Sequence, residues 1–308
     1  TSAIGTSTGT WTVTGATGNT ATCDHTVTVA DNEIPTITCA ADVAVDTDAS
    51  SCFATVVLSN PTTADNCSVA SVTNNAPATY PIGTTTVTWT VTDNAGNTAT
   101  CSQDITVTDD EAPSITCAAN QTQTADAGNC SAAVTVVAPV VSDNCAVASI
   151  TNDFNGTDDA SDVYAVGTTT ITWTVTDIHG NVSTCSQDIT ITDNEAPSIT
   201  CAANQTQAAD AGGCDAAVTV ISPATSDNCL VASVVNNYNG TSDATDVYPA
   251  GTTTVGWTVT DIHGNTSTCS QDIAITDEEV PTITCAAVQM RTSDAGNCSA
   301  AVTVVAPV

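Results

Sequence analysis

Apolar and polar residues alternate along several short stretches of the chain. Thr alternates with Val, Trp and Val in TTVTWTVTD at 85–93, and the pattern returns in TTITWTVTD at 169–177. The same period of two runs through SQDITVTD at 102–109 and AAVTVVAP at 132–139. Alternation with many β-branched residues predicts antiparallel strands with one buried face, and no apolar period of 3.6 residues indicates a helix. The chain is therefore expected to be all-β.

Turn-forming residues separate these stretches. Pro, Asp-Asn-Cys, Asp-x-x-Gly-Asn and Asp-Ala-Gly-Asn recur between the alternating runs, and each favours a tight change of direction. Units of roughly 80 residues with about five to seven short strands are typical of an immunoglobulin-like β-sandwich. One tryptophan in each unit is expected to point into the core, namely Trp11, Trp89, Trp173 and Trp257.

Cysteine spacing shows that the chain is a tandem array. The cysteine that ends each Pro-x-Ile-x-Cys motif recurs after 78, 84 and 84 residues. A second cysteine follows after 13 residues, a third after 15 more, and the fourth precedes the next motif cysteine by 16. This repetition predicts a partial repeat at 1–31, complete repeats at 32–109, 110–193 and 194–277, and a partial repeat at 278–308.

The two partial repeats are complementary parts of one unit. Residues 1–31 match the second half of a repeat and residues 278–308 match the first part, so about 22 further residues would complete a fourth repeat. The simplest interpretation is a section of a longer polypeptide. The alternative is that identical subunits join by completing each other's broken repeat.

One segment of the repeat varies in length. The gap between the third and fourth cysteines is 34, 40 and 40 residues in the three complete repeats. The additional residues lie in FNGTDDASDVY at 154–164 and YNGTSDATDVY at 238–248. Variation of this kind predicts a surface loop that could bind a ligand.

Fifteen cysteines in a regular acidic chain indicate an oxidising compartment and a disulfide framework. If strands alternate in direction, the first two cysteines of each repeat meet at its C-terminal end, and the third and fourth meet at its N-terminal end. We therefore expect two disulfides per domain, with Cys23 left unpaired; the rival pairing of first with fourth and second with third within a repeat would leave three cysteines unpaired. The predicted pairs are Cys39–Cys52, Cys67–Cys101, Cys117–Cys130, Cys145–Cys185, Cys201–Cys214, Cys229–Cys269 and Cys285–Cys298.

Charge excludes several classes of partner. The chain carries 33 acidic residues against the single base Arg291, a net charge of −32. Such a surface repels nucleic acid and anionic membranes, and no apolar run of 18 residues could insert into a bilayer. A mean hydropathy of +0.11 with 41% hydrophobic residues still indicates folded domains. We therefore expect bound cations to balance the charge.

Acidic runs recur at the joints between repeats, for example TDNEAPSITC at 192–201. The expected topology brings the Asp-Asn-Cys and Asp-x-x-Gly-Asn loops to each joint, and together they form a set of hard oxygen ligands that suits Ca²⁺ better than Mg²⁺. For any one motif alone, turn formation is sufficient explanation. The predicted calcium ligands are Asp31, Glu33, Asp109, Asp110, Glu111, Asp143, Asp177, Asn181, Asp193, Glu195, Asp227, Asp261, Asn265, Asp277 and Glu279.

The motif order resembles the hyalin repeat, or HYR, family. Residues 113–193 carry it as PSITC, GNC, SDNC, VGTTTITWTVTDIHGN, STC and DITITD, and it recurs in three complete and two partial units. Two departures stand out: Ala40 and its counterparts replace the usual Pro, and Gly15 stands where other units have Asp. The resemblance implies an immunoglobulin-like fold and extracellular, often adhesive, roles without catalysis. The joints also resemble the calcium-binding linkers of cadherins.

Taken together, these features predict a structural section of a calcium-braced extracellular fibre, filament or stalk at a cell surface. Its partners would be further repeats of the same polypeptide or identical subunits. The alternative is an adhesin that recognises a glycan or protein through 154–164 and 238–248. An enzyme is not expected, because no nucleophile has a base nearby. His179 and His263 lie in Asp-Ile-His-Gly-Asn turns and His25 follows Cys23. Isolated turn histidines are usually solvated, so no metal or catalytic role is expected for them.

Overall fold

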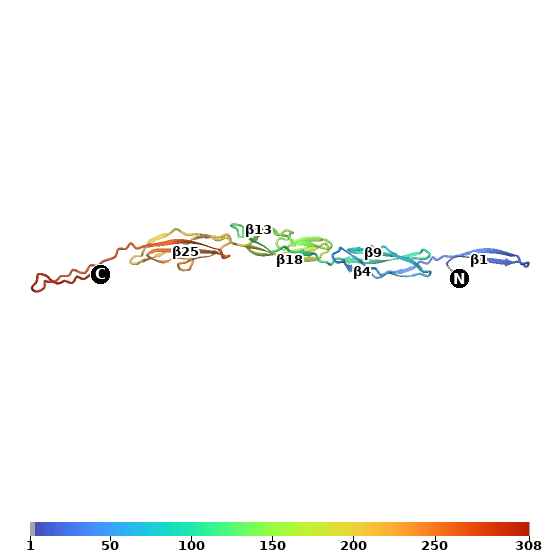
Figure 1. Ribbon diagram of the computed structural model, residues 1–308, viewed down its shortest axis with the longest axis horizontal. Helices are drawn as coiled ribbons and strands as arrows, with labels where there is room; N and C mark the ends of the chain where they lie inside the picture. Colours follow the sequence, from blue (N-terminus) through green and yellow to red (C-terminus); the bar gives the residue numbers. More distant parts are fainter. Residues whose placement is uncertain (1–3, 308) are drawn as a thin grey trace. The chain divides into compact units, whose positions relative to one another are not determined.

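A computed structural model describes residues 4–307. The chain divides into two compact units, one comprising residues up to Gln121 with 135–162 and 169–189, the other comprising 122–134, 163–168 and the chain from Thr190 onward. Figure 1 shows a ribbon of strands and loops. The repeat at 110–193 contributes residues to both units. All regular structure in the described residues is β, which confirms the predicted fold class of tandem β-sandwich repeats.

Twenty-six strands are present in the described residues, eight in each complete repeat, rather than the roughly five to seven expected. The partial repeat contributes β1 (Gly5–Thr14) and β2 (Thr20–Val29). The first complete repeat contains β3 (Thr36–Thr38), β4 (Val43–Asp46), β5 (Phe53–Ala54), β6 (Thr62–Ala64), β7 (Val69–Asn74), β8 (Tyr80–Pro81), β9 (Gly83–Asp93) and β10 (Thr98–Thr108). The second contains β11 (Ser114–Thr116), β12 (Gln121–Thr124), β13 (Ser131–Val134), β14 (Val140–Ser142), β15 (Val147–Asn152), β16 (Asp162–Ala165), β17 (Gly167–Asp177) and β18 (Val182–Thr192). The third contains β19 (Ser198–Thr200), β20 (Gln205–Ala208), β21 (Asp215–Val218), β22 (Ala224–Ser226), β23 (Val231–Asn236), β24 (Asp246–Pro249), β25 (Gly251–Asp261) and β26 (Thr266–Thr276).

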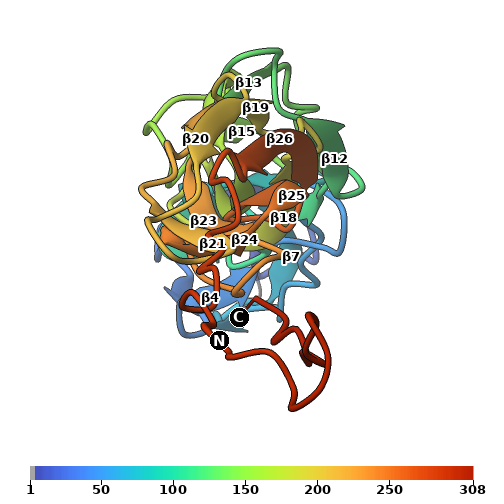
Figure 2. The ribbon, with the colours of Figure 1, turned by 90° about the vertical axis from the view of Figure 1, so that its left-hand side faces the viewer.

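Each sandwich has one four-stranded layer and one layer of short strand pairs. In the first complete repeat the larger sheet has the order β4-β10-β9-β7, and the pairs β3–β6 and β5–β8 form the other layer. The third repeat has the same arrangement, with β20-β26-β25-β23 opposite β19–β22 and β21–β24 (Figure 2). Strands β4 and β20 lie parallel to β10 and β26. The first strand of the repeat is therefore split into two parts, such as β3 and β4, which lie in different layers. The chain crosses between the layers directly after the first cysteine of the repeat.

The alternation along β9 and β10 builds the core. Val87, Trp89 and Val91 are buried on one face of β9, and Thr residues lie between them. Ile105 and Val107 of β10 complete the cluster together with side chains from the opposite layer. This is the half-buried pattern expected when one face of an antiparallel pair covers a core.

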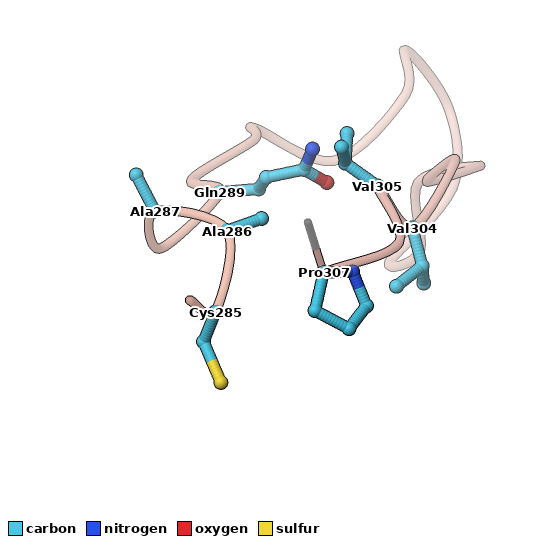
Figure 3. Close-up of a pocket in the computed structure, with 7 residues that line it drawn as sticks. All are labelled: Cys285, Ala286, Ala287, Gln289, Val304, Val305 and Pro307. Carbon is cyan, nitrogen blue, oxygen red and sulfur yellow. The ribbon is translucent and has the colours of Figure 1, made fainter. Parts of the chain in front are cut away.

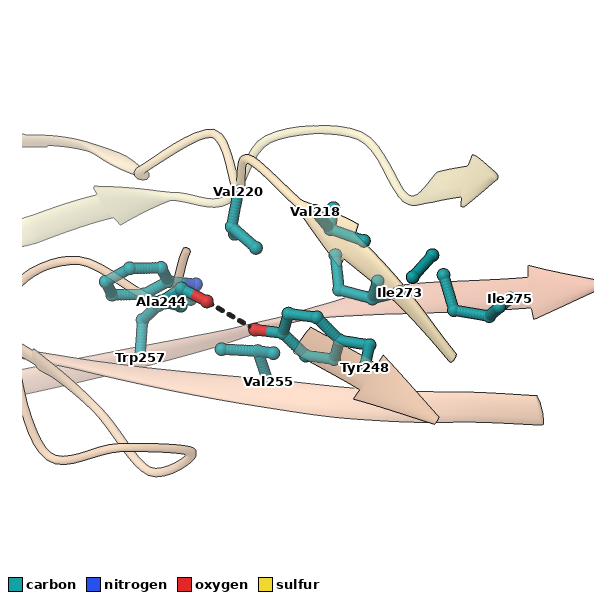
Figure 4. Close-up of a cluster of buried hydrophobic side chains, with 9 residues drawn as sticks. Val218, Val220, Ala244, Tyr248, Val255, Trp257, Ile273 and Ile275 are labelled. Atoms are coloured by element: carbon teal, nitrogen blue, oxygen red, sulfur yellow. Dashed lines mark hydrogen bonds between the residues drawn. The ribbon is translucent and has the colours of Figure 1, made fainter. Parts of the chain in front are cut away.

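The core of the third repeat shows the same construction with a buried tyrosine (Figure 4). Trp257 is 1% exposed and packs with Val218, Ile273 and Tyr248. The Tyr248 hydroxyl donates a 2.6 Å hydrogen bond to the Ala244 carbonyl. Burial, with smaller contributions from nearby Tyr238 and acidic groups, raises the pKa of Tyr248 to about 12. The phenol is thus a neutral donor that ties the variable loop to the core.

The N-terminal hairpin has the same apolar face as the central hairpin of a complete repeat, but the opposite layer of strands does not cover it. Strands β1 and β2 pair in register from Gly5 opposite Val29 to Thr14 opposite Thr20. Trp11 and Val13 are 68% and 70% exposed, whereas Trp89 at the same position of the next repeat is 3% exposed. The hairpin therefore displays an apolar face that every complete repeat buries.

The disulfides differ from the predicted pairs. One bridge lies within each complete repeat, between its first and fourth cysteines, and a second type joins the second cysteine of one repeat to the third cysteine of the next. The bridges within repeats are Cys39–Cys101, Cys117–Cys185 and Cys201–Cys269, and those between repeats are Cys52–Cys145 and Cys130–Cys229. Five cysteines are free: Cys23, as expected, and Cys67, Cys214, Cys285 and Cys298.

All seven predicted pairs are therefore wrong: Cys39–Cys52, Cys67–Cys101, Cys117–Cys130, Cys145–Cys185, Cys201–Cys214, Cys229–Cys269 and Cys285–Cys298. The error has a physical origin in the split first strand. Cys39 lies at the crossing between β3 and β4, beside the middle of β10 where Cys101 sits, instead of at the end of the repeat. The Gln103 side chain fixes this crossing with a 2.6 Å hydrogen bond to the Ala41 carbonyl. Cys52 is then left at the end of a turn, where it meets the next repeat.

Replacing Trp257 by Ala should destabilise the third repeat by about 3–5 kcal/mol, because a large buried side chain is lost and a cavity remains. Hydrogen exchange of the β25 and β26 amides measures this local change. The matched control is Trp11→Ala, which should have little effect because Trp11 is 68% exposed. Equal effects of the two substitutions would contradict the assigned cores.

Peptide mapping of the oxidised chain under non-reducing conditions should recover Cys52 linked to Cys145 and Cys130 linked to Cys229. Digestion at aspartate is suitable, because the chain offers 33 acidic residues and only one base. Peptides that link Cys39 to Cys52 would show that the pairing within the repeat is the true one.

Candidate metal centre

Three clusters of three aspartates lie at the N-terminal ends of the complete repeats. In each cluster, one oxygen from every carboxylate lies within 4.8 Å of the others. A cation such as Ca²⁺ binds oxygens at about 2.3–2.6 Å, so oxygens this close can all contact one ion. The clusters are Asp31, Asp65 and Asp93; Asp109, Asp143 and Asp177; and Asp193, Asp227 and Asp261.

Two carboxylates of each cluster are positioned by the alternation of the strands. Asp177 ends β17, two residues after buried Val175, and is itself 2% exposed. Asp109 follows β10, two residues after buried Val107, and is 6% exposed. Every second residue of the strand points inward, so Val and Trp enter the core, and the last inward position, at the end of the sheet, places an aspartate in the joint.

The third carboxylate comes from the Asp-Asn-Cys loop. Asp143 Oδ2 accepts the backbone N–H groups of Cys145 and Ala146, both at 2.9 Å. Asp143 Oδ1 is buried and has no hydrogen-bond partner in the described residues. Asp65 and Asp227 have the same unpartnered Oδ1 atom, and Asp31 has an unpartnered Oδ2. A buried carboxylate oxygen without a donor is costly unless a cation binds it, so these residues fit a bound cation.

Hydrogen bonds keep the strand-end aspartates ionised. Burial disfavours the charged form of Asp177, but donors from the Asn181 side chain and from the backbone of Asn181, His179 and Gly180 outweigh it and lower the pKa of Asp177. Equivalent bonds lower the pKa of Asp93 and of Asp261. These carboxylates are therefore available as anionic ligands at neutral pH.

Two histidines contact the clusters from exposed positions in their turns, so they are solvated as expected. His179 Nδ1 lies 2.9 Å from Asp109 Oδ2, and His263 Nδ1 lies 3.0 Å from Asp193 Oδ2. Both residues are exposed, with side-chain exposures of 25% and 28%. The cysteine sulfur nearest each histidine is held in a disulfide, so it offers no thiolate to a soft metal. His25 is exposed too and lies near Trp11.

Glutamates of the acidic runs bind the turn of the preceding repeat instead of joining a cluster. Glu111 Oε2 accepts the Ser50 N–H at 3.0 Å. Glu195 and Glu279 accept the N–H of Gly128 and of Gly212, each at 2.8 Å. The acidic joint is thereby attached to the turn that ends in the second cysteine.

Asparagines complete the joint as donors. Asn144 Nδ2 donates to the Ser51 carbonyl at 3.1 Å and to Asp109 Oδ1 at 3.0 Å. Asn181 Nδ2 donates to the Asp109 carbonyl at 2.9 Å, and Asn265 does the same for Asp193 at 3.2 Å. Asn181 and Asn265, the two asparagines predicted as calcium ligands, therefore attach the Asp-x-x-Gly-Asn turn to the joint as hydrogen-bond donors.

Seven of the predicted ligands lie in the clusters, namely Asp31, Asp109, Asp143, Asp177, Asp193, Asp227 and Asp261. Glu33 binds the Asn66 amide, and Asp110 and Asp277 are exposed outside the clusters. Sequence reasoning missed Asp65 and Asp93, although they occupy the repeat positions of Asp143 and Asp177. A strict alignment of the repeats would have found both.

The side chains of the variable loops form hydrogen bonds within the loops. Asn152 Oδ1 accepts the N–H groups of Phe154 and Asn155, both at 2.9 Å. Asn155 Nδ2 donates to the Asp159 carbonyl at 2.8 Å, and Asn236, Asn239 and Asp243 repeat the arrangement in the third repeat. The loops are compact, internally bonded structures.

An apolar recess of about 360 Å³ lies in the C-terminal segment (Figure 3). Cys285, Ala286, Gln289, Val304 and Pro307 are among the residues that line it. It contains no carboxylate and is unrelated to the clusters.

Comparison with known proteins identifies the repeat. The HYR domain model matches residues 30–107, 108–191 and 192–275. Hyalin of Strongylocentrotus purpuratus is 29% identical over 313 aligned positions, covering 96% of this chain and 26% of that protein. Hyalin of Lytechinus variegatus is 29% identical over 259 positions, covering 80% and 48%. The chain thus spans about a quarter to a half of the length of these relatives.

Solved structures with some likeness are cadherin-type ectodomains. The protocadherin GammaB4 extracellular domain is 15% identical, with a TM-score of 0.36 over 87% of this chain and 53% of that one. Mouse cadherin-23 EC22-24 is 11% identical, with a TM-score of 0.34 over 80% and 100%.

Asp177 should titrate below the ordinary aspartate pKa of about 3.9 in metal-free protein. Because its pKa is lowered by folding, its stabilising contribution is present above the unfolded-state pKa and is lost as pH falls through the folded-state pKa. Carboxyl-carbon NMR and unfolding measured from about pH 5 to about pH 2 test this. Asn181→Ala removes the side-chain donor and should raise the pKa. An unchanged pKa in that variant would contradict the assigned cause.

Proposed function

Because the chain belongs to the HYR domain family, we propose that it is a structural section of a long extracellular fibre, filament or stalk whose joints are braced by calcium. The observation that carries the proposal is the buried cluster of three carboxylates at the joint, with an oxygen that has no donor. HYR repeats are a structural repeat family, which supports a role without catalysis.

The chemistry of the clusters favours calcium. Three carboxylates whose oxygens lie within 4.8 Å of one another repel, and the chain's only Lys or Arg residue, Arg291, lies far along the sequence from every cluster. Ca²⁺ accepts six to eight oxygens in irregular geometry, so carbonyls and water would complete its shell. Mg²⁺ requires a tighter octahedron that three fixed carboxylates do not preorganise.

Metal and disulfide would act on the same loop. Asp143 supplies a cluster oxygen, and Cys145, two residues later, bonds to Cys52 of the preceding repeat. A cation at the cluster would hold this loop to the joint residue Asp109, while the disulfide holds it to the preceding turn. Together the two links would limit bending at the joint, which is the property that a fibre requires.

An extracellular location is supported by the disulfides, which persist in oxidising compartments. Extracellular calcium modules bind with dissociation constants of about 10⁻⁴–10⁻³ M, so the joints would fill in calcium-rich surroundings. Among the described residues, no helix is long and apolar enough to span a membrane. The partners in the fibre would be further HYR repeats of the same polypeptide or of identical subunits.

Adhesion through the loops at 154–164 and 238–248 is the alternative role, with a glycan or protein as ligand. Asn155 and its equivalents bond within the loop itself, which supports a structural function over a preformed ligand site.

Asp143→Asn should lower the calcium affinity of that joint on the order of tenfold or more, because calcium affinity depends on the number of charged ligands. Calorimetry with calcium chloride on the full oxidised chain measures this. Asp110→Asn is the matched control, since Asp110 is exposed at the same joint outside the cluster. Equal losses in both variants would show that binding reflects only general charge.

The native chain should also lose thermal stability in EGTA, which removes calcium, because an ion that binds only the folded state stabilises that state by mass action. An unchanged thermal midpoint at millimolar calcium and in EGTA would rule out calcium bracing.

A further inference from the structure

Both variable loops carry an acceptor motif for N-linked glycans. The motif is Asn-x-Ser/Thr, where x is not Pro, and it occurs nine times in the chain, so its presence alone singles out no site. It reads Asn-Gly-Thr at 155–157 in the second repeat and again at 239–241 in the third. The first complete repeat lacks both the additional loop residues and a motif at that place. The structure distinguishes among the nine amides.

The acceptor amide of the second repeat is exposed and keeps one N–H group available. Asn155 Nδ2 donates to the Asp159 carbonyl at 2.8 Å. Asn155 Oδ1 accepts the Thr157 N–H at 3.1 Å and the Thr157 hydroxyl at 2.9 Å. Because a side-chain amide nitrogen carries two N–H groups, one can be replaced by a bond to a sugar while the other keeps the bond to Asp159. A glycan at this position therefore leaves the loop intact.

The third repeat places its acceptor in the same way. Asn239 is exposed, and its Nδ2 donates to the Asp243 carbonyl at 2.9 Å. The Thr241 hydroxyl donates to Asn239 Oδ1 at 2.9 Å. The two loops differ at several other positions, yet they preserve the exposed amide, the hydroxyl two residues later and the bonds between them.

Apolar surface lies next to each acceptor in the sequence. Phe154, directly before Asn155, is 39% exposed, and Val163 of the same loop is 57% exposed. In the third repeat Tyr238 precedes the acceptor, and Val247 is 48% exposed. A pyranose ring has a face of C–H groups that can pack on the apolar body of an aromatic side chain. The first sugars of a glycan on either loop thus have apolar surface nearby to cover.

Two other motifs in the same repeats have no amide to spare. Asn181 Nδ2 uses both of its N–H groups, donating to the Asp109 carbonyl at 2.9 Å and to Asp177 Oδ2 at 2.8 Å. Asn265 makes the equivalent two bonds at 3.2 and 2.7 Å. A sugar on either nitrogen would break a bond that attaches the Asp-x-x-Gly-Asn turn to the joint. These residues are internal controls for the loop acceptors.

A further pair of motifs is engaged by a neighbouring strand. Asn120 Oδ1 accepts the Asp188 N–H at 3.0 Å, and Asn120 Nδ2 donates to Asp188 Oδ2 at 3.1 Å, which ties Asn120 to β18. Asn204 makes the same two contacts with Asp272 of β26, at 3.1 and 3.5 Å. A sugar on these nitrogens would lie against a carboxylate, whereas the loop acceptors donate to a backbone carbonyl of their own loop.

We propose that Asn155 and Asn239 carry N-linked glycans, so that the variable loops display a sugar. This assignment goes beyond the calcium-braced fibre and does not depend on a bound cation. It gives the additional loop residues of the second and third repeats a purpose that their internal hydrogen bonding leaves open. A compact, exposed loop is the kind of surface on which a bulky and solubilising group is accommodated.

The modification is a group transfer from an oligosaccharide that is linked to a polyprenyl pyrophosphate, with a membrane-bound transferase of the secretory pathway as catalyst. The Asn155 Nδ2 atom forms a bond to the anomeric carbon of the first sugar. The bond between that carbon and the pyrophosphate oxygen breaks, and the lipid pyrophosphate leaves with the electron pair. Nδ2 releases one proton, and nothing is oxidised or reduced.

The test secretes the full chain from cultured animal cells, which glycosylate Asn-x-Ser/Thr motifs. Peptide N-glycosidase in heavy-oxygen water converts each glycosylated Asn to a labelled Asp, and mass spectrometry of digests locates the label. Most molecules should carry the label at Asn155 and Asn239, and none at Asn181 or Asn265. Thr157→Ala should abolish the label at Asn155 and leave that at Asn239 unchanged. The matched variant Thr157→Ser keeps the hydroxyl and should retain the label at Asn155.

Unlabelled Asn155 and Asn239 in the secreted native chain would overturn the proposal, because the two motifs would then serve only the hydrogen bonds of their loops. A label at Asn155 that persists in Thr157→Ala would also overturn it, as would a label at Asn181 or Asn265. The site map of the native chain decides the question even where a variant is not secreted. Calcium calorimetry on the same protein is a separate measurement, so calcium bracing and glycosylation stand or fall independently.

Discussion

An ionised carboxylate can stay buried only if hydrogen-bond donors or positive charge compensate it, and this constraint governs every joint of the chain. Asp177 receives its donors from the Asp-x-x-Gly-Asn turn, and Asp109 receives donors from both repeats at its joint. Asp143 Oδ1 receives none. His179 Nδ1 contacts Asp109 Oδ2 at 2.9 Å, but the unpartnered oxygen of Asp143 still gives the cluster a position that suits a cation. The turns, the histidines and the asparagines are arranged around this requirement.

Small cores impose a second constraint. Each complete repeat buries one Trp and one Tyr in a small core, and its first strand changes layers to close that core. The bridge from first to fourth cysteine fixes that crossing to the middle of the central hairpin. This frees the second cysteine to bond to the next repeat. A bridge typically contributes about 2–5 kcal/mol in a small secreted domain, and here two of the five bridges join one repeat to the next.

Three polar segments of the repeat form contacts between neighbouring repeats. The acidic run, the Asp-Asn-Cys loop and the turn before the second cysteine all contact one another at the joint. The variable loops lie apart from this set and bond internally. The joints before the second and third complete repeats are thus linked by a disulfide and by hydrogen bonds from the acidic run.

The sequence by itself determined the all-β class, the repeat boundaries as a hypothesis, the inward tryptophans Trp89, Trp173 and Trp257, and the gathering of carboxylates at the joints, because period-two alternation and exact repetition are local signals. The prediction that Trp11 points into a core was wrong, since Trp11 is 68% exposed. Asp93 and Asp65 could also have been found from repeat phase. Only the tertiary structure decided the disulfide partners and the contact of His179 with Asp109. Those depend on where the first strand splits and on which loops of successive repeats touch, and no local pattern in a single repeat encodes a contact that two repeats make together.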